Sequence, residues 1–438
     1  MKYFSLLLII TDTICATTVV QSSDLPYDCV YCQVEQIHIS YGEKPNDIVI
    51  TWNTKADTAE SLVEYGVDEI DKRVEGWRVS FIDGRGQWVH RVQLTDLLYD
   101  TRYVYHCGSQ YRWSEQLWFR TPPAGEDWVV RAAIFGDLGV DNARALPYIQ
   151  NEAQRSKFDV IIHVGDFAYD MHEEDSRVGD QFMRQIQPLA ATVPYMTCPG
   201  NHEENRNFSN YRNRFSMPLM NETDSLFYSW NLGSVHFIAI NTEAYYFLNY
   251  GAAPLVNQYQ WLEKDLKEAT KPQNRRRRPW LVMLGHRPMY CSNSDDVDCG
   301  EEYTRRGIFG MLGLEPLLKK FGVDLVIWAH EHSYERTWPL YDNVVYNGSY
   351  EHPYVNPRAP VHVITGSAGC KEGRDHFKNN PQSWSAFRSQ DFGYTRLKAY
   401  NKTHINIEQV SVDLDGQVID HFWLIKNKTL SFSMIISP

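Results

Sequence analysis

The middle of the chain is built from short apolar runs that stop abruptly at polar residues. Residues 160–164 form the clearest run, with the length and β-branched content of a strand that is buried on both faces. Gly165 breaks it, and the oxygens of Asp166, Tyr169 and Asp170 follow at once. A buried parallel strand that ends at Gly-Asp delivers a carboxylate to the carboxyl edge of its sheet, where open α/β folds bind their ligands.

Four other apolar runs end in the same way. They lead to a carboxylate, an amide or imidazoles, namely Asp137, Asn201 with His202, His286, and His330 with His332. Helical periodicity between the runs, at residues 142–157, 175–190, 256–270 and 314–321, predicts an α/β domain. We therefore expect the strand ends to meet at one site, which the rest of the domain holds together.

A different pattern precedes this domain. Residues 33–121 alternate in short β-like runs separated by Gly and Asp turns, which is the spacing of a small β-sandwich. Residues 97–105 carry a Leu-x3-Thr-x-Tyr-x-Tyr pattern that resembles a fibronectin type III strand with its tyrosine corner. Residues 121–128 contain two prolines and predict a linker, so the second domain should cover residues 129–426.

The β pattern returns near the end of the chain. From Tyr394 onward, alternating runs predict strands, and Asp415-Gly416 predicts a hairpin turn between two of them. We assign this tail to the edge of the sheets of the α/β domain and not to a separate domain. Residues 275–278 are four consecutive arginines just before a buried strand, which we interpret as an exposed loop, with a processing site as the alternative.

The composition fits two or three domains with large cores. The chain has 438 residues, of which 43% are hydrophobic. A formal charge of −12 argues against nucleic acid or an anionic membrane surface as the main partner. No apolar run approaches the roughly 20 residues needed to span a bilayer.

Two features favour the secretory route. Residues 1–22 combine one Lys, a short apolar stretch and small residues, which predicts a signal peptide. Asn-x-Ser/Thr sequons predict N-linked glycans at Asn207, Asn221, Asn347, Asn401 and Asn427. We therefore expect a glycoprotein that is secreted or lysosomal.

The number of cysteines is odd once the predicted signal peptide is removed. Without the signal peptide seven cysteines remain, so at least one thiol is free or paired between chains. Cys291 and Cys299 flank a polar loop and predict a local disulfide. Cys29-x-x-Cys32 has the spacing of a metal-binding or redox motif, but the sequence contains no second Cys-x-x-Cys motif that could complete a metal site. A structural bridge is therefore the favoured interpretation.

Five motifs stand in order at the predicted strand ends. They are GDLG (136–139), GDFAYD (165–170), GNHE (200–203), GHRPMY (285–290) and AHEHSYER (329–336). With these motifs the chain resembles, over nearly its whole length, the purple acid phosphatases, dimetal phosphoesterases with a fibronectin-like N-terminal domain. The resemblance implies an N-terminal β-sandwich followed by an α/β sandwich with two mixed sheets.

The resemblance also implies a ligand set. One metal ion would be bound by Asp137, Tyr169 and His332, the second by Asn201, His286 and His330, and Asp166 would bridge the two. Carboxylate and phenolate oxygens suit a ferric ion, whereas two imidazoles and an amide suit a divalent Zn, Fe or Mn ion. Asp170 is expected to make a local hydrogen bond, and His163, His172 and Glu203 are expected to support the site without being ligands.

The implied reaction is the hydrolysis of phosphate monoesters at acidic pH by a metal-bound hydroxide. His202 would contact the phosphate or protonate the leaving oxygen. Small phosphomonoesters or phosphoproteins are the expected substrates. Two departures from the family pattern are Ala329, where Gly is frequent, and the loop at 291–299, where many plant members have two histidines and this chain has Asp295 and Asp296.

Two alternatives stay open at this point. A phosphodiesterase or a phosphoprotein phosphatase could use the same metal core, although Tyr169 argues against it. A non-catalytic adhesion or binding protein could use the β-sandwich, although an intact ligand set argues against a decayed site. The physiological substrate, the divalent metal and the oligomeric state do not follow from the sequence.

Overall fold

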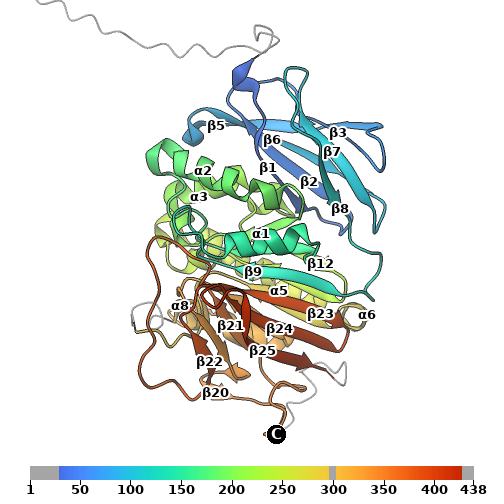
Figure 1. The fold of residues 1–438 in the computed structure, drawn as a ribbon. Helices are drawn as coiled ribbons and strands as arrows, with labels where there is room; N and C mark the ends of the chain where they lie inside the picture. The colour runs from blue at the N-terminus through green and yellow to red at the C-terminus, as the bar shows by residue number, and fades with distance from the viewer. Residues whose placement is uncertain (1–28, 295–301, 427–438) are drawn as a thin grey trace, which may run out of the picture.

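The computed structural model describes residues 29–294 and 302–426, which form an N-terminal β-sandwich above a larger α/β body (Figure 1). The sandwich has one sheet in the order β1 (Glu35–Tyr41), β2 (Ile48–Thr54), β6 (Gln87–Leu94) and β5 (Trp77–Phe81). The other sheet has the order β4 (Lys72–Glu75), β3 (Leu62–Gly66), β7 (Arg102–Gly108) and β8 (Leu117–Arg120).

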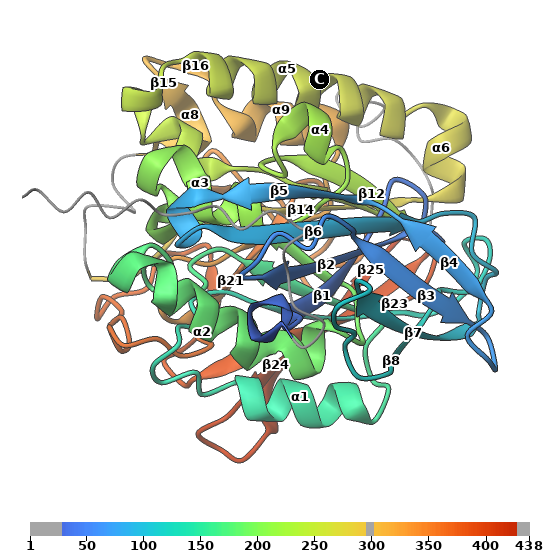
Figure 2. The same ribbon diagram turned by 90° about the horizontal axis from the view of Figure 1, so that it is seen from above.

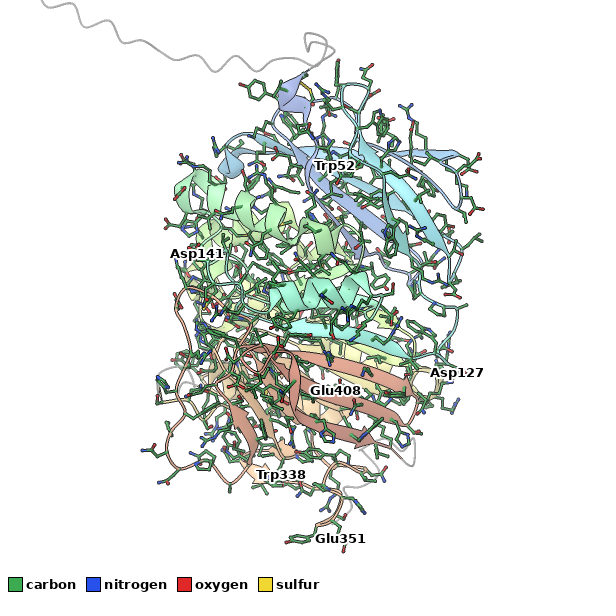
Figure 3. The ribbon with its side chains drawn as sticks, viewed as in Figure 1. Trp52, Asp127, Asp141, Trp338, Glu351 and Glu408 are labelled. Atoms are coloured by element: carbon green, nitrogen blue, oxygen red, sulfur yellow. A yellow bond between two sulfur atoms is a disulfide. The ribbon has the colours of Figure 1, made fainter. Side chains whose placement is uncertain are left out.

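Aromatic side chains fill the sandwich. Trp52, labelled in Figure 3, is fully buried, as is Phe119. The Leu98 N–H donates to the Tyr103 hydroxyl at 3.0 Å, which is the hydrogen bond of a tyrosine corner. The predicted fibronectin-like sandwich is therefore confirmed.

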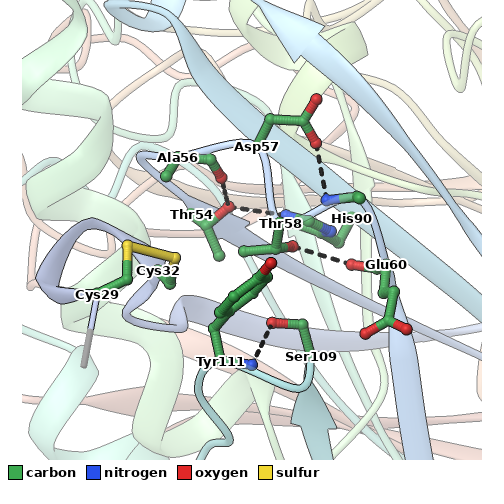
Figure 4. The surroundings of a disulfide bond; sticks show 11 residues. Cys29, Cys32, Thr54, Ala56, Asp57, Thr58, Glu60, His90, Ser109 and Tyr111 are labelled. Carbon is green, nitrogen blue, oxygen red and sulfur yellow. Dashed lines mark hydrogen bonds between the residues drawn. A yellow bond between two sulfur atoms is a disulfide. The ribbon is translucent and has the colours of Figure 1, made fainter. Parts of the chain in front are cut away.

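A disulfide closes the start of the described chain. Cys29 and Cys32 form a disulfide across the short helix η2 (Val30–Cys32), which agrees with the interpretation as a structural bridge (Figure 4). The turn is fixed to the end of β2 because the Lys55 N–H donates to the Tyr31 carbonyl at 3.0 Å. Cys291 is also disulfide-bonded. Its predicted partner, Cys299, lies outside the described residues.

The α/β body contains two mixed sheets, as expected. The first has six strands in the order β11 (Tyr195–Cys198), β10 (Val160–Val164), β9 (Val130–Phe135), β23 (Gly393–Asn401), β24 (His404–Ser411) and β25 (Gln417–Ile425). The second has seven strands in the order β12 (Tyr228–Leu232), β13 (Val235–Ala239), β14 (Trp280–Leu284), β17 (Leu325–Trp328), β21 (Val361–Thr365), β18 (Tyr334–Thr337) and β22 (Ser385–Ser389).

Strand alternation divides the apolar side chains between two cores. Along β14, Val282 belongs to the core shared with the first sheet, whereas Leu281 and Met283 belong to a second core. Helices α5 (Ala253–Ala269) and α9 (Leu314–Phe321) supply the other side of that second core. Helices α1 (Leu146–Gln154) and α2 (Glu173–Ala190) lie on the opposite side of the molecule (Figure 2).

Shorter elements connect these layers. They are η3 (Ile82–Gly84), η4 (Asn201–Glu203), α3 (Asn205–Arg214), α4 (Met220–Thr223), η5 (Thr242–Tyr245), η6 (Leu248–Tyr250), α6 (Pro272–Arg277), α8 (Tyr303–Arg306), β15 (Gly307–Ile308), β16 (Met311–Leu312), β19 (Leu340–Tyr341) and β20 (Val344–Val345). No helix within the described ranges is long and apolar enough to cross a bilayer.

The C-terminal tail completes the first sheet. Strand β23 pairs antiparallel with β9, and β24 and β25 extend the sheet from there. Asp415 and Gly416 both have positive φ, 54° and 83°, in the connection between β24 and β25. The predictions that the tail belongs to the α/β domain and turns at Asp415-Gly416 are confirmed.

The arginine run at 275–278 is not the exposed loop that we expected. It begins inside helix α6, and Arg275 is buried, donating to the Gly322 carbonyl at 2.8 Å. Arg277 pairs with Glu126 of the inter-domain linker at 2.6 Å. Three of the four arginines, Arg275, Arg277 and Arg278, therefore have structural partners, which the run of arginines in the sequence does not reveal.

Polar contacts join the sandwich to the body. Inside α2 and α3, Glu174–Ser176 and Arg206–Phe208 have positive φ, a conformation that costs about 1–2 kcal/mol per residue. Asp83 of η3 contacts both elements, because its carbonyl accepts from Ser176 Oγ at 2.6 Å and its carboxylate accepts from Ser209 Oγ at 2.5 Å. The sandwich therefore helps to hold these two unusual turns.

A buried ion pair lies at the same interface. Arg214 Nη1 is 3.0 Å from Asp180 Oδ1, and both side chains are almost fully buried. Asp180 also accepts from Gln87 of β6 at 2.7 Å. We predict that Arg214→Ala lowers the free energy of unfolding by about 3–5 kcal/mol, because it leaves a buried carboxylate unpaired.

The control for this change is Arg212→Ala. Arg212 pairs with Asp224 at the surface, where removal of one partner costs about 1 kcal/mol or less. Thermal or urea unfolding of both variants would measure the difference. Equal small losses would contradict the assigned importance of the Arg214 pair.

Candidate metal centre

The predicted strand ends meet at one end of the interface between the two sheets. Strands β9, β10 and β11 of the first sheet lead to Asp137, Asp166 and Asn201, and β14 and β17 of the second lead to His286 and His330. His286 Nδ1 lies 2.9 Å from the Val164 carbonyl of the opposite sheet. The site is therefore built from both sheets.

The backbone turns sharply where these strands end. Asp137, Asp166, Tyr169 and His330 have φ of 58°, 51°, 56° and 72°, a region that non-glycine residues adopt at a cost of about 1–3 kcal/mol each. Such strain is typical of functional sites. Here it occurs in the loops that carry the candidate ligands.

One group of candidate ligands surrounds Tyr169. Its hydroxyl lies 2.7 Å from His332 Nε2 and 3.2 Å from Asp137 Oδ1. His332 Nε2 and Asp137 Oδ1 are 3.6 Å apart. These three donor atoms are thus close enough to bind one ion together.

A second group surrounds His286. Its Nε2 lies 3.1 Å from Asn201 Oδ1, 3.2 Å from His330 Nδ1 and 3.2 Å from Asp166 Oδ2. Donor atoms of Asp166, His286 and His330 all lie within 4.8 Å of one another, a geometry that could hold a metal ion. The two groups are linked, since the backbone N–H of His330 donates to Asp137 Oδ2 at 3.0 Å.

These residues fit metal ions in their chemistry and in their surroundings. When His286 Nδ1–H donates to the Val164 carbonyl, its Nε2 lone pair is left facing the other donors, as expected of a metal-binding imidazole. Glycine is required close by, because a Cβ at Gly200 would lie 2.2 Å from Asp166 Oδ1 and one at Gly165 would lie 2.4 Å from His286 Nδ1. Anionic oxygens with Tyr169 suit a hard trivalent ion, and the His286 group suits a divalent one.

Burial shapes the electrostatics. Burial, reinforced by the carboxylates of Asp137 and Asp166, raises the pKa of Tyr169 well above its usual value. A phenolate at this position therefore requires a cation nearby. Burial opposes ionisation of Asp166, but the charges of His286, His202 and His330 hold the pKa of Asp166 below its usual range.

His202 lies beside the candidate ligands with its ring against Tyr169, at 4.5 Å between ring centroids. Its Nδ1 is 3.0 Å from Asp170 Oδ1, so the local hydrogen bond predicted for Asp170 is present. Its Nε2 lies 4.0 Å from Asp166 and 3.7 Å from Glu372. Burial lowers the pKa of His202, but the hydrogen bond to Asp170 and the charge of Asp166 outweigh it and raise the pKa to about 9.

Glu203 supports the site as expected. Its carboxylate accepts hydrogen bonds from the backbone N–H groups of Asp166 at 2.9 Å, Phe167 at 3.0 Å and Gly200 at 2.9 Å. These bonds join the loops after β10 and β11. Asp295 and Asp296 lie outside the described residues.

Sequence reasoning missed a further contribution, from β21. The residues that follow this strand contact the site through Cys370, Lys371, Glu372 and Asp375. A signal was present, because the apolar run at 361–365 also ends at a glycine. It was overlooked because no carboxylate, amide or imidazole follows that glycine directly.

Comparisons with known proteins agree with this geometry. Three family models match the chain: the purple acid phosphatase N-terminal domain at residues 34–121, the calcineurin-like phosphoesterases at 130–334, and the iron/zinc purple acid phosphatase-like protein C at 359–421. Acid phosphatase type 7 of Homo sapiens is 50% identical over 402 residues, which are 90% of this chain and 91% of that protein.

Two other relatives extend the comparison. Acid phosphatase type 7 of Danio rerio is 51% identical, covering 90% of this chain and 92% of that protein. The structure of purple acid phosphatase PPD1 from yellow lupin seeds superposes with a TM-score of 0.76 at 26% identity, covering 90% of this chain and 74% of that one. The fold and the identity thus point to the same family.

We predict that Glu203→Ala disrupts the site although Glu203 is not a candidate ligand. The change leaves three buried backbone N–H groups without an acceptor, and each unsatisfied group lowers the free energy of unfolding by about 1–3 kcal/mol. Lower metal retention and a lower melting temperature are expected, and both can be measured on the purified protein. Glu204→Ala is the control, since Glu204 is half-buried and accepts from the Tyr250 hydroxyl instead; equal effects of the two changes would refute the assigned role.

Proposed function

Since the chain belongs to the purple acid phosphatase family, we propose that it hydrolyses phosphate monoesters at acidic pH with a ferric ion and a divalent Zn, Fe or Mn ion in its site. The chain is an acid phosphatase of the metallophosphoesterase superfamily. The observation that carries the finer proposal is the convergence of two linked donor groups, around Tyr169 and around His286, from two sheets.

In this proposal, Asp137, Tyr169 and His332 would hold the ferric ion, while Asn201, His286 and His330 would hold the divalent ion. Asp166 would contribute to both sites. When bound, the metal ions would lower the pKa of water and neutralise phosphoryl oxygens.

The protein's own groups complete the chemistry. Asp170 holds Nδ1 of His202 at 3.0 Å, which leaves Nε2 facing the site. A protonated Nε2 can contact the phosphate or donate its proton to the leaving oxygen. Because His202 is only partly exposed, it is partly shielded from exchange with solvent.

The test of the proposed function is a substrate panel combined with metal analysis. Purified protein loaded with iron and zinc would be assayed from acidic to alkaline pH on aryl, sugar and nucleotide monoesters, phosphopeptides and a phosphodiester. We expect hydrolysis of monoesters with an acidic optimum and two metal ions per chain. A preference for the diester would favour the phosphodiesterase alternative, and absence of both metal and activity would favour the binding protein.

We predict that Tyr169→Phe removes the colour of the iron-loaded protein. A phenolate bound to ferric iron donates charge to it, so the oxidised wild type should be pink to purple. Activity should fall less than colour, because the phenolate is not the nucleophile. Tyr195→Phe is the control, since Tyr195 is equally buried but bonds His163. A Tyr169→Phe protein that keeps the absorption band would show that the iron is bound differently.

We predict that His202→Ala keeps both metal ions but lowers kcat by about 10²–10⁴-fold, the usual contribution of general acid–base assistance. Steady-state kinetics with metal quantitation measures both effects. His106→Ala is the control, since His106 lies in strand β7 of the sandwich and pairs with Glu64 there. An unchanged kcat across the acidic range would exclude His202 from the reaction.

We also propose that the protein is secreted or lysosomal. Asn221 and Asn401 are exposed and Asn207 and Asn347 are partly exposed, so these sequons support glycosylation, while Asn427 lies outside the described residues. The Cys29–Cys32 disulfide supports an oxidising compartment. The mature protein should lack residues 1–22 and lose mass on glycosidase treatment. An intact Met1 without any mass shift would refute the proposal.

A further inference from the structure

An exposed pair of aromatic side chains lies on the first sheet, beside a predicted glycosylation site. Tyr400 of β23 and Trp423 of β25 are each 40% exposed, and their ring centroids are 5.2 Å apart. The strands that carry them flank β24 (Figure 1). Asn401, the first residue of an Asn-x-Thr sequon, follows Tyr400 directly. A glycan on this asparagine would therefore begin beside the two rings.

A β-bulge determines the face of the sheet on which Asn401 lies. Ala399 of β23 pairs with Ile405 of β24, and both residues are buried. His404, the residue before Ile405, therefore lies on the opposite face of the sheet. Two residues of β23, Tyr400 and Asn401, stand opposite His404, which is the arrangement of a β-bulge. Since directly opposite residues point to the same face, Asn401 shares the face of His404.

Hydrogen bonds connect the Asn401 amide to the same surface. Its Oδ1 accepts from the backbone N–H and from the hydroxyl of Thr403, both at 2.8 Å. Thr403 Oγ1 lies 2.7 Å from Nδ1 of His404, whose ring centroid is 6.1 Å from that of Trp423. Because Oδ1 is bonded within the turn, Nδ2 points away from Thr403. Nδ2 is the atom that carries an N-linked glycan.

We propose that the N-linked glycan at Asn401 packs its first N-acetylglucosamine residues against Trp423 and Tyr400, an inference that rests on the proposed secretory route. The C–H groups on one face of a pyranose ring fit the electron-rich face of an aromatic ring. Packing of sugar on the two rings would also remove exposed apolar surface from water. The glycan is the favoured occupant because it is tethered beside Tyr400, so its contact with the rings is intramolecular.

A packed glycan differs from a free one in its accessibility. A glycosidase must reach the first sugar residues, so packing should slow their release from the folded protein. Asn221 provides an internal comparison, because its sequon is exposed in helix α4 and no residue from 219 to 224 is aromatic. The ratio of the release rates at Asn401 and Asn221 therefore reports packing at Asn401.

The experiment measures this ratio on the full chain expressed in a eukaryotic secretory host. The folded protein is incubated with peptide N-glycosidase without denaturant, and mass spectrometry of its peptides follows each sequon. Tyr400→Ser and Trp423→Ser each remove one ring, whereas Trp423→Phe keeps an aromatic face. Trp77→Ser is the control, since Trp77 is 38% exposed in β5 of the sandwich.

We expect both Ser variants to release the Asn401 glycan about 2–10-fold faster than the wild type, relative to Asn221, which is the effect of one aromatic contact on a rate. Trp423→Phe should keep most of the protection, and Trp77→Ser should match the wild type.

A melting-temperature cycle separates packing from a loosened hairpin. Asn401→Gln removes the glycan and the bonds to Thr403, in the wild type and in the Trp423→Ser background alike. The melting temperature should fall by about 1–2 °C more in the wild type, because only there does the glycan have a ring to contact. Equal falls in the two backgrounds would contradict packing.

Three other results would overturn the inference. Equal release rates in the wild type and both Ser variants would do so while leaving the secretory route intact, since the glycans would still be present. Equal rates with a wild-type dimer that the Ser variants lose in size-exclusion chromatography would assign the rings to a second copy of the chain. Glycan at Asn221 without glycan at Asn401 would show that the sequon is not used.

The glycan content of the whole chain separates this inference from the proposal on which it rests. A chain without glycan at any sequon would refute the secretory route, and the inference would fail with it. Glycan at the other sequons, with no protection at Asn401, would refute the inference alone.

Discussion

The site depends on the close contact between two sheets at His286. This imidazole comes from the second sheet, yet its Nδ1 bonds the Val164 carbonyl of the first sheet and its Nε2 faces Asp166 and Asn201. The contact is possible only because Gly165 leaves room for it. A side chain at Gly165 would push His286 away, and a side chain at Gly200 would displace Asp166.

Convergence of this kind has an electrostatic cost. Asp166 and Tyr169 are almost fully buried, and burial favours the neutral forms of both groups. Imidazoles compensate in part. A bound cation would stabilise the ionised forms, so metal binding and the stability of these loops should be thermodynamically linked.

The surrounding structure holds the strained loops from several directions. Glu203 joins two of them through backbone N–H groups, and Asp375 holds a third by accepting from the backbone N–H of His332. Farther out, Asp83 of the sandwich contacts the turns that follow the site. The sandwich is thus part of the support of the catalytic body and is not a loosely tethered module.

The amino-acid sequence by itself determined the architecture and the candidate ligands. The period of the apolar residues distinguishes sandwich from α/β body, and a buried strand that ends at Gly-Asp or Gly-His must place that polar group at a sheet edge. Local pattern was therefore enough for Asp166 and His286. It was not enough for the arginine run at 275–278, whose partners lie far away in the chain.

Tertiary structure alone brought in the support that comes from the residues after β21. Asp375 is 43 residues from His332, and nothing in its own neighbourhood marks it as the acceptor of that residue's backbone N–H. The contact follows from the parallel pairing of β21 with β17, which brings the ends of the two strands together. Apolar periodicity is a property of neighbouring residues, whereas the pairing of strands is decided by long-range packing. For that reason the sequence identified the ends of the strands, and only the fold showed what lies between them.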